Sequence, residues 1–310
     1  MNYSLAELKN GSFCPECGKF LTAKTIVQKK MLPAITEQVD DKESFVRMIY
    51  QNALIVDKPI TKCDKCFSKY KFSRLQDFNF KPCFPPVGSS ETGQVLFIAI
   101  NPRCKPGSND EDFYRHTLAS KENFIQFSKD GSYKTKHGYW KKLFSDRHYS
   151  IHQQCLSNID PSWRLGINSS VAELFMCGKE STEIFSKIEN PLLECICARE
   201  YLIKYIELIK PKVIVTFGRL PLKWFQSKFG TNIKESIKQL DKNSSNELNF
   251  LGNPVNQGIK KTHSCFAKIK LESGHMMHII FSGHPGKWMS NKEKEKLLRT
   301  FSYVAKPLFS

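Results

Sequence analysis

The sequence predicts an α/β fold, a three-layer α/β/α sandwich around a central four-stranded parallel sheet, preceded by a small N-terminal module. Four short apolar runs, rich in β-branched and aromatic residues, have the composition of strands that are buried on both faces of a sheet. Amphipathic helical patterns alternate with these runs, which is typical of β-α-β units. A stretch rich in proline and aromatic residues marks a seam near residue 80, so the sequence predicts a module over residues 1–80 and a domain over residues 81–310.

The predicted strands end in polar turns. The first strand, residues 95–100, runs into Asn101-Pro102, and the second, residues 170–177, contains the acidic residue Glu173. The third strand follows Pro211-Lys212, and the fourth, residues 278–281, leads to His284-Pro285. Because open α/β sheets bind ligands at the carboxyl ends of their strands, these turns are the candidate site.

Helical periodicity and composition predict the remaining elements. An apolar stripe predicts a strong helix over residues 191–210, and a further helix is expected over residues 221–229. The charged pattern of residues 291–298 predicts an amphipathic helix with a solvated outer face. Residues 241–258, rich in Asn, Ser and Gly, are expected to form a loop. Residues 137–144 are interpreted as a helix-like run whose aromatic side chains pack in the core.

The composition is that of a soluble, basic protein. The 310 residues carry 47 Lys and Arg against 30 Asp and Glu, a net charge of +17, which favours a polyanion such as nucleic acid as the partner. No apolar run approaches the roughly 20 residues of a membrane span, and the first nine residues lack the pattern of a signal peptide. We therefore expect a cytoplasmic monomer with no membrane partner.

Two C-x-x-C pairs predict a metal site in the N-terminal module. Cys14 and Cys17 form one pair, Cys63 and Cys66 form the other, and four thiolates close a tetrahedron around one structural zinc ion. The alternative is an iron-sulfur cluster that combines Cys63 and Cys66 with two of the downstream residues Cys177, Cys195 and Cys197. The cluster would leave Cys14 and Cys17 without a role, so zinc is favoured over the cluster.

The order of the motifs resembles the uracil-DNA glycosylase superfamily. Asn101-Pro102 and His284-Pro285 are similar to the motifs G-[IM]-N-P-G and H-P-S of its mismatch-specific and single-strand-selective branches. The pattern can be followed from residue 92 to residue 305. Residues 171–177 and 208–218 look like the thermostable and related branches, and residues 137–141 are similar to the N-R-F-W-K stretch of the mismatch-specific branch.

The resemblance implies an enzyme that flips a nucleotide out of DNA and hydrolyses its glycosidic bond without a small-molecule cofactor. Asn101 matches the position that holds the attacking water, and His284 matches the position that donates a hydrogen bond to the departing base. Residues that follow the second motif enter the gap in the duplex, and an aromatic ring lies beneath the flipped base. By this resemblance, Lys287, Trp288 and Met289 would enter the gap, and Tyr133 or Tyr114 would lie beneath the flipped base.

The chain departs from the family pattern at several positions. Ala99 and Arg103 stand where the family has glycines, Arg103 being assigned to DNA binding, and Gly286 replaces the serine of the second motif. Glu173 stands where the family has the asparagine that reads uracil. An ionised carboxylate only accepts hydrogen bonds, and glutamate accepting from cytosine N4 is a standard pairing. The substrate expected from this departure is a modified cytosine, as in family members that attack hypermodified bacteriophage DNA in host defence.

Two other functions stay open at this point. One is repair of uracil or mismatched bases in DNA. The other is a DNA-binding module that contains zinc and a degenerate glycosylase domain without catalytic activity. Substitution of Asn101 or His284 separates an enzyme from a module that only binds DNA.

Overall fold

In the computed structural model, the described residues fall in fourteen ranges. They are 12–13, 20–21, 40–54, 84–100, 113, 121–135, 137–145, 149–174, 176, 201–229, 237–241, 246–249, 265–283 and 289–310. The chain divides into two compact units, Met1–Val39 and Asp40–Ser310. In the first unit, β1 (Ser12–Phe13) pairs with the antiparallel strand β2 (Phe20–Leu21).

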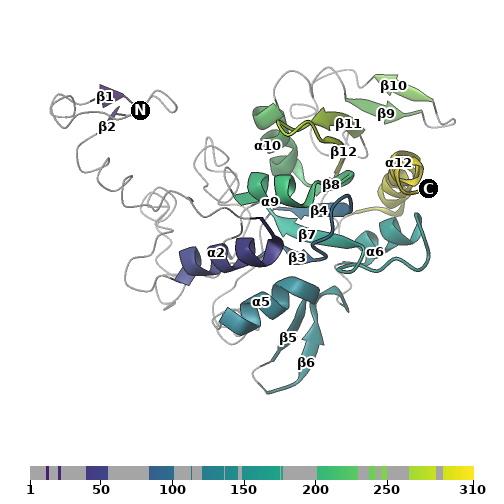
Figure 1. The fold of residues 1–310 in the computed structure, drawn as a ribbon. Helices are drawn as coiled ribbons and strands as arrows, with labels where there is room; N and C mark the ends of the chain where they lie inside the picture. Colours follow the sequence, from purple (N-terminus) through teal and green to yellow (C-terminus); the bar gives the residue numbers. More distant parts are fainter. Residues whose placement is uncertain are drawn as a thin grey trace. The chain divides into compact units, whose positions relative to one another are not determined.

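The second unit is a mixed α/β structure built on an eight-stranded sheet, with six described α-helices (Figure 1). The strand order is β10-β9-β11-β12-β8-β4-β7-β3. The strands are β3 (Val87–Gly88), β4 (Val95–Ala99), β7 (Ser169–Glu173), β8 (Val213–Phe217), β9 (Lys238–Leu240), β10 (Glu247–Asn249), β11 (Cys265–Lys270) and β12 (Met276–Ser282). The helices are α2 (Lys42–Leu54), α5 (Lys121–Asp130), α6 (Ser150–Ser157), α9 (Leu202–Ile209), α10 (Arg219–Phe229) and α12 (Asn291–Phe309).

The four predicted strands form the centre of the sheet. Strands β12, β8, β4 and β7 are mutually parallel neighbours, and their apolar residues are buried because helices cover both faces. The prediction of a sheet with only four strands is wrong, because antiparallel strands extend it on both sides. Strand β3 pairs with β7, and β11, β9 and β10 continue beyond β12. The sheet is therefore mixed, with a parallel core.

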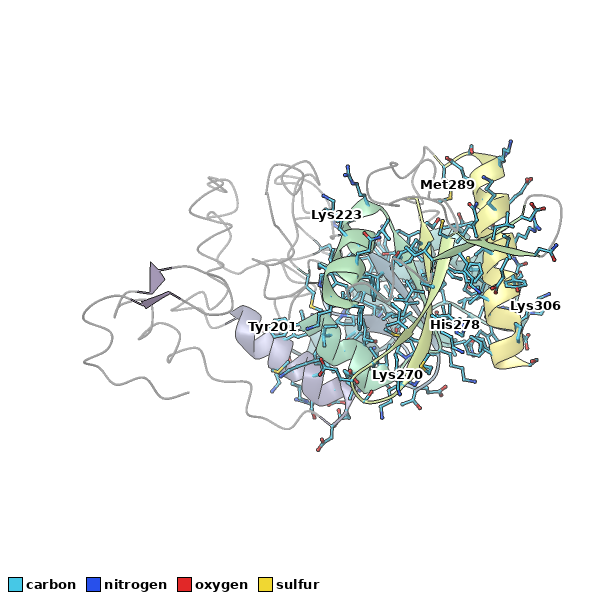
Figure 2. The ribbon with its side chains drawn as sticks, turned by 90° about the horizontal axis from the view of Figure 1, so that it is seen from above. Tyr201, Lys223, Lys270, His278, Met289 and Lys306 are labelled. Atoms are coloured by element: carbon cyan, nitrogen blue, oxygen red, sulfur yellow. The ribbon has the colours of Figure 1, made fainter. Side chains whose placement is uncertain are left out.

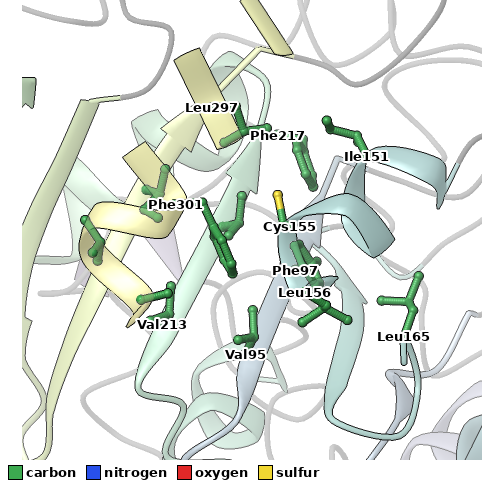
Figure 3. Packing of buried hydrophobic residues seen from close by; sticks show 14 of the residues in the cluster. Val95, Phe97, Ile151, Cys155, Leu156, Leu165, Val213, Phe217, Leu297 and Phe301 are labelled. Carbon is green, nitrogen blue, oxygen red and sulfur yellow. The ribbon is translucent and has the colours of Figure 1, made fainter. Parts of the chain in front are cut away.

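One face of the sheet packs on α6 and α12. Phe97 of β4 and Phe217 of β8 lie in one apolar cluster with Cys155 of α6 and with Leu297 and Phe301 of α12 (Figure 3). A capping box begins α12, since the Ser290 side chain accepts from the Glu293 N–H and the Glu293 carboxylate accepts from the Ser290 N–H. The apolar stripe of this capped helix is thereby held against the sheet.

Helices α9 and α10 cover the opposite face. Phe281, which points away from the first cluster because strand side chains alternate, meets Phe225 of α10 with ring centroids 6.5 Å apart. Figure 2 shows α12 and the helix of Lys223 on different sides of the strands. Helix α9 ends at Lys210, whose left-handed backbone (φ 41°) turns the chain directly into Pro211 and β8.

Helix α2 belongs to the second unit. Its Phe45 stacks on Tyr205 of α9 at 5.6 Å, and its Tyr50 meets Phe124 of α5 at 5.3 Å. The division between the two compact units therefore falls at residue 39, about 40 residues before the predicted seam near residue 80. Residues 55–83 lie outside the described ranges, so the predicted extent of the N-terminal module stays a prediction.

Several local predictions differ from the structure. The loop expected over residues 241–258 contains β10, and the helix-like run at residues 137–144 is instead a strand, β6 (Trp140–Lys142), followed by a short 3-10 turn, Leu143–Ser145. Tyr139 and Trp140 are 72% and 66% exposed, so the interpretation as core residues is wrong. None of the helices that the structure describes combines the length and the apolar character needed to cross a membrane.

Candidate functional site at the carboxyl edge of the parallel strands

A row of side chains crosses the sheet where the parallel strands end. Ser282 pairs with Phe217, and Ala99 pairs with Glu173. The register between β4 and β8 continues this alignment, so all four side chains lie on the face that α6 and α12 cover. This edge is also the topological switch point, because the chain leaves β4 toward β7 and leaves β8 toward β12 on the opposite side. The fold therefore brings the predicted strand ends together at the place where α/β sheets bind ligands.

Glu173 is the ionisable side chain in this row. Its residue is only 7% exposed, and burial raises the pKa of the carboxyl to about 8. Among the described residues, no donor lies within hydrogen-bond distance of its Oε2 atom. The backbone next to it is fixed, since the Leu174 N–H donates to the Ala99 carbonyl at 3.0 Å. Burial therefore favours the neutral form of this carboxyl, which can both donate and accept a hydrogen bond.

A second polar atom without a described partner lies in the same row. The buried Ser282 Oγ has no hydrogen-bond partner among the residues that the structure describes. Burying a hydroxyl or a carboxyl without a partner costs on the order of 1–3 kcal/mol per group. A ligand with polar edges that reached both ends of the row would recover part of this free energy.

His152 is a buried ionisable side chain beside this row that the sequence analysis did not single out. It projects from α6 and is 2% exposed, with its ring 4.9 Å from the Phe97 ring and 4.7 Å from the Phe217 ring. The ring of Tyr149 lies 5.3 Å from it. In the sequence, His152 falls on the apolar stripe of a short helix, a pattern that indicates a core residue, so nothing in the sequence singled it out.

Gly218 lies at the carboxyl end of β8, between the ends of β4 and β12. It follows β8 with φ 96°, and a Cβ atom there would lie 2.8 Å from Cδ1 of Ile100. Its N–H donates to the Ser282 carbonyl at 2.9 Å, which ties the end of β8 to the end of β12. Both the backbone conformation and the close approach of Ile100 therefore require glycine. Ile100 directly precedes Asn101 in the chain.

The predicted site residues divide into described and undescribed positions. Glu173, Tyr133 and Met289 are described. Those that lie outside the described residues are Asn101, Arg103, Tyr114, His284, Lys287, Trp288, Cys14, Cys17, Cys63 and Cys66. The structure therefore gives their flanking elements alone: β4 ends two residues before Asn101, and β12 ends two residues before His284.

Tyr133 and Met289 have structural contacts. Tyr133 lies on β5 (Ser132–Lys134), with its ring 4.8 Å from Phe113 and 6.2 Å from Phe127. Met289 is 7% exposed and packs in the core cluster, so the wedge predicted for this segment depends on Lys287 and Trp288. A ring beneath the flipped base stays a prediction for Tyr133.

Metal and thiol chemistry have no support within the described part of the chain. No three of its His, Cys, Asp and Glu side chains gather as metal ligands. Cys155 and Cys265 are buried free thiols, and burial raises the pKa of both, that of Cys265 to about 12. These two cysteines are core residues without nucleophilic character. The predicted zinc ligands are not among the residues covered.

The structure is that of an α/β protein with a buried carboxyl at the carboxyl edge of its parallel strands. Comparison with models of known protein families gives no match, and comparison with curated proteins finds no match either.

Proposed function

We propose that this protein is a DNA glycosylase that flips a base out of DNA, hydrolyses its N-glycosidic bond and leaves an abasic site. The observation that carries the proposal is the buried carboxyl of Glu173 beside the end of β4, the strand that leads to Asn101. A polar group at this edge suits recognition of a flat, polar ligand such as a nucleobase.

The strand order supports a pocket between the two sequence motifs. Strands β4 and β12 lie on either side of β8 and run in the same direction, so the segments that begin after them start from one edge of the sheet. Strands two places apart are separated by about 10 Å. A single base held between groups from the two segments would meet Asn101 on its sugar side and His284 at its leaving oxygen. These two roles rest on the motif resemblance.

The chemistry assigned to the two residues follows from the charges that develop. Breaking the glycosidic bond leaves positive charge on the sugar and negative charge on the base, so water must be held at the sugar and a donor must face the base. The neutral amide of Asn101 would orient the water, and His284 would donate to the base. The reaction needs no resident cofactor, and the net charge of +17 supports a DNA substrate.

Glu173 is proposed to read the base in its protonated form. The sequence-based argument assumed an ionised carboxylate, but burial raises the pKa of this group to about 8. A neutral carboxyl can donate its O–H to N3 of cytosine and accept from N4, which satisfies both polar positions of that edge. We propose a modified cytosine as the substrate, with phage DNA in host defence as one biological setting.

Uracil is the second candidate, and the same observation is compatible with it. A protonated carboxyl can accept from the N3–H of uracil and donate to O4, so the charge of Glu173 does not exclude that base. Uracil or mismatch repair therefore remains the alternative enzymatic function. The non-catalytic alternative, a DNA-binding protein with a zinc module, predicts no base release at all.

Mass spectrometry of released bases tests the proposal. The purified chain is incubated with DNAs that contain cytosine, hydroxymethylcytosine, glucosylated hydroxymethylcytosine or uracil. We expect release of a modified cytosine, and loss of that release in Asn101→Ala and His284→Ala. Efficient release of uracil with the modified cytosines left intact would select the repair function. DNA binding without release from any substrate would overturn the enzymatic proposal.

The four cysteines of the two C-x-x-C pairs are proposed to bind a structural zinc ion. Support comes from β1 and β2, which pair with Phe13 opposite Phe20, because Cys14 and Cys17 lie between these two strands in the sequence. Zinc knuckles commonly occupy such connections. The zinc would stabilise the fold of the N-terminal segment and takes no part in the proposed reaction.

A further inference from the structure

A small β-hairpin outside the main sheet has a surface that the proposed active site does not use. Strand β5 pairs with β6 as a separate two-stranded sheet, with Lys134 opposite Trp140 and Tyr133 opposite Lys141 (Figure 1). The connection is ordered by backbone bonds: the Thr135 N–H donates to the Tyr139 carbonyl at 2.8 Å, and the Gly138 N–H donates to the Thr135 carbonyl at 2.9 Å. Gly138 supplies the positive φ of 85° that this turn needs.

The base of the hairpin is fixed to the domain. The Gly131 N–H donates to the Phe127 carbonyl of α5 at 2.8 Å, and the Leu143 N–H donates to the Gly131 carbonyl at 2.9 Å. The Tyr133 ring contacts Phe113 and Phe127. The hairpin is therefore a supported element, and its outer residues project from a rigid base.

One face of the hairpin presents an aromatic ring between two cations. Side chains alternate along a strand, so Lys134, Trp140 and Lys142 lie on the face opposite to Tyr133. Trp140 is 66% exposed, its neighbour Tyr139 is 72% exposed, and both lysines are exposed. By the same alternation Tyr139, which precedes Trp140 at the turn, projects from the other face. We call Lys134, Trp140 and Lys142 the hairpin surface, and Tyr139 is a second exposed ring at the turn.

The hairpin itself carries charge of one sign, between Asp130 and Asp146 in the sequence. Residues 131–145 contain four lysines and neither Asp nor Glu. Cores of protein–protein interfaces are depleted in lysine, so this arrangement suits a protein partner poorly. Aromatic rings that stack on bases, beside cations that neutralise phosphates, are the usual means of binding unpaired nucleic acid. The exposed area of Trp140 and Tyr139 would gain most from bases that are not already stacked in a duplex.

We propose that the hairpin surface binds an unpaired stretch of DNA. Trp140 stacks on a base, Lys134 and Lys142 contact the flanking phosphates, and Tyr139 stacks on a further base where the strand passes the turn. The choice of DNA rests on the proposed function, whereas the stacking and the charge pairing rest on the hairpin itself. In an enzyme that opens the duplex around one nucleotide, such a surface would hold the strand next to the flipped base.

Binding of a fluorescent single-stranded oligonucleotide to the full chain tests the proposal. The double variant Tyr139→Ala/Trp140→Ala should bind about 10- to 100-fold more weakly, because each stacked base contributes substantially to affinity. Trp140→Phe keeps an aromatic ring and should retain binding within a few-fold. Quenching of tryptophan fluorescence on binding should be smaller in Trp140→Phe, which is a direct sign of stacking by this residue.

The lysines are tested by the salt dependence of binding. Each single-strand phosphate that a lysine contacts contributes about 0.7 to the steepness with which log K falls against log salt. Lys134→Ala/Lys142→Ala should therefore make this dependence shallower by about 1.4. The matched control is Lys292→Ala/Lys296→Ala on α12, which removes two exposed lysines of equal charge. An equal loss of affinity in the control would show that only the net charge of the protein matters, and would overturn the proposal. Unchanged affinity of the Tyr139→Ala/Trp140→Ala variant would overturn it as well.

Further measurements distinguish the kind of partner that the hairpin binds, and test the hairpin proposal apart from the glycosylase proposal. A larger loss of binding to duplex DNA, to single-stranded RNA or to phosphatidylserine vesicles than to single-stranded DNA in the hairpin variants would overturn the assignment to unpaired DNA. Asn101→Ala should keep hairpin binding while it loses base release. If the wild-type chain releases no base but the hairpin variants still lose single-strand binding, the glycosylase proposal fails and the hairpin proposal stands.

Discussion

Glu173 carries the base recognition in the proposed site, and its protonation state depends on burial. The carboxyl lies among apolar neighbours at the end of β7, and burial raises its pKa from 4.5 to about 8. The folded state therefore holds a proton that the unfolded chain releases above pH 4.5. This group's contribution to stability is fully present below pH 4.5 and is lost as the pH rises through about 8.

Glu173→Gln removes this titration and keeps the size and the hydrogen-bonding capacity of a neutral carboxyl. We expect the variant to gain stability relative to the wild type as the pH rises from 4.5 to 8, by at most about 5 kcal/mol. Urea unfolding at several pH values measures the difference. Glu91→Gln, at an exposed carboxyl, is the control. A difference between wild type and Glu173→Gln that stays constant across this range would contradict a buried, protonated Glu173.

At the scale of elements, a buried lysine connects α2 to the sheet domain. Lys42 Nζ donates to the Ser128 carbonyl of α5 at 2.8 Å and to the Gly88 carbonyl of β3. The Ser128 hydroxyl donates in turn to the Pro86 carbonyl at 2.6 Å. Burial lowers the pKa of Lys42 from 10.5 to about 7. The unfolded chain therefore binds more protons than the folded chain between pH 7 and pH 10.5, so this group adds stability as the pH rises through that window.

Lys42→Met should remove this pH dependence and leave the Gly88 and Ser128 carbonyls without their donor. We expect the stability of the wild type relative to the variant to increase between pH 7 and pH 10 by a few kcal/mol, on the order of the linkage free energy. Thermal or urea unfolding of both proteins across this range measures the difference. Lys129→Met, at an exposed lysine of α5, is the control. A constant difference with pH would show that Lys42 stays charged in the folded protein.

Among the strands, those that sequence patterns predicted are the ones buried on both faces. The continuous apolar runs of β4 and β8 have few other interpretations, because such runs are too short for core helices and too apolar for edges. Strand β11 was not predicted, because its apolar run is only three residues long before Lys268 and Lys270 begin to alternate with Ile269. The prediction of a helix-like run at the hairpin was wrong, because Tyr139 and Trp140 were interpreted as core residues without regard to the lysines that flank them.

At the candidate site, too, the sequence predicts what local patterns encode and misses what depends on contacts between distant segments. Glu173 could be found from sequence, because an acid within an apolar run is unusual and its place in the motif order was clear. The shift in its pKa could not be predicted from sequence, because that shift depends on how completely other elements bury the carboxyl. His152 approaches Phe97 and Phe217 through the packing of α6 on the sheet, a contact between distant segments that a local pattern does not encode.

At the scale of the whole molecule, the N-terminal region is proposed to depend on metal, whereas the sheet domain has a large apolar core of its own. A segment too short to bury a sizeable core of its own gains folding free energy from metal ligation. We expect the purified chain to contain about one zinc ion per molecule, in keeping with a site of four thiolates. Metal analysis by mass spectrometry measures zinc, iron and sulfide on the same sample.

Cys14→Ser and Cys63→Ser should each reduce the zinc content severalfold, because a structural site with three thiolates binds the ion much more weakly. Cys265→Ala is the control, since this buried thiol belongs to β11 and to neither C-x-x-C pair. Iron and sulfide in place of zinc, retained in Cys14→Ser and lost in Cys63→Ser, would select the iron-sulfur alternative. Zinc content that is unchanged in both serine variants would overturn the four-cysteine site. Single-strand DNA binding measured on the same variants then reports whether the N-terminal region takes part in DNA binding, because the β5–β6 hairpin is intact in all of them.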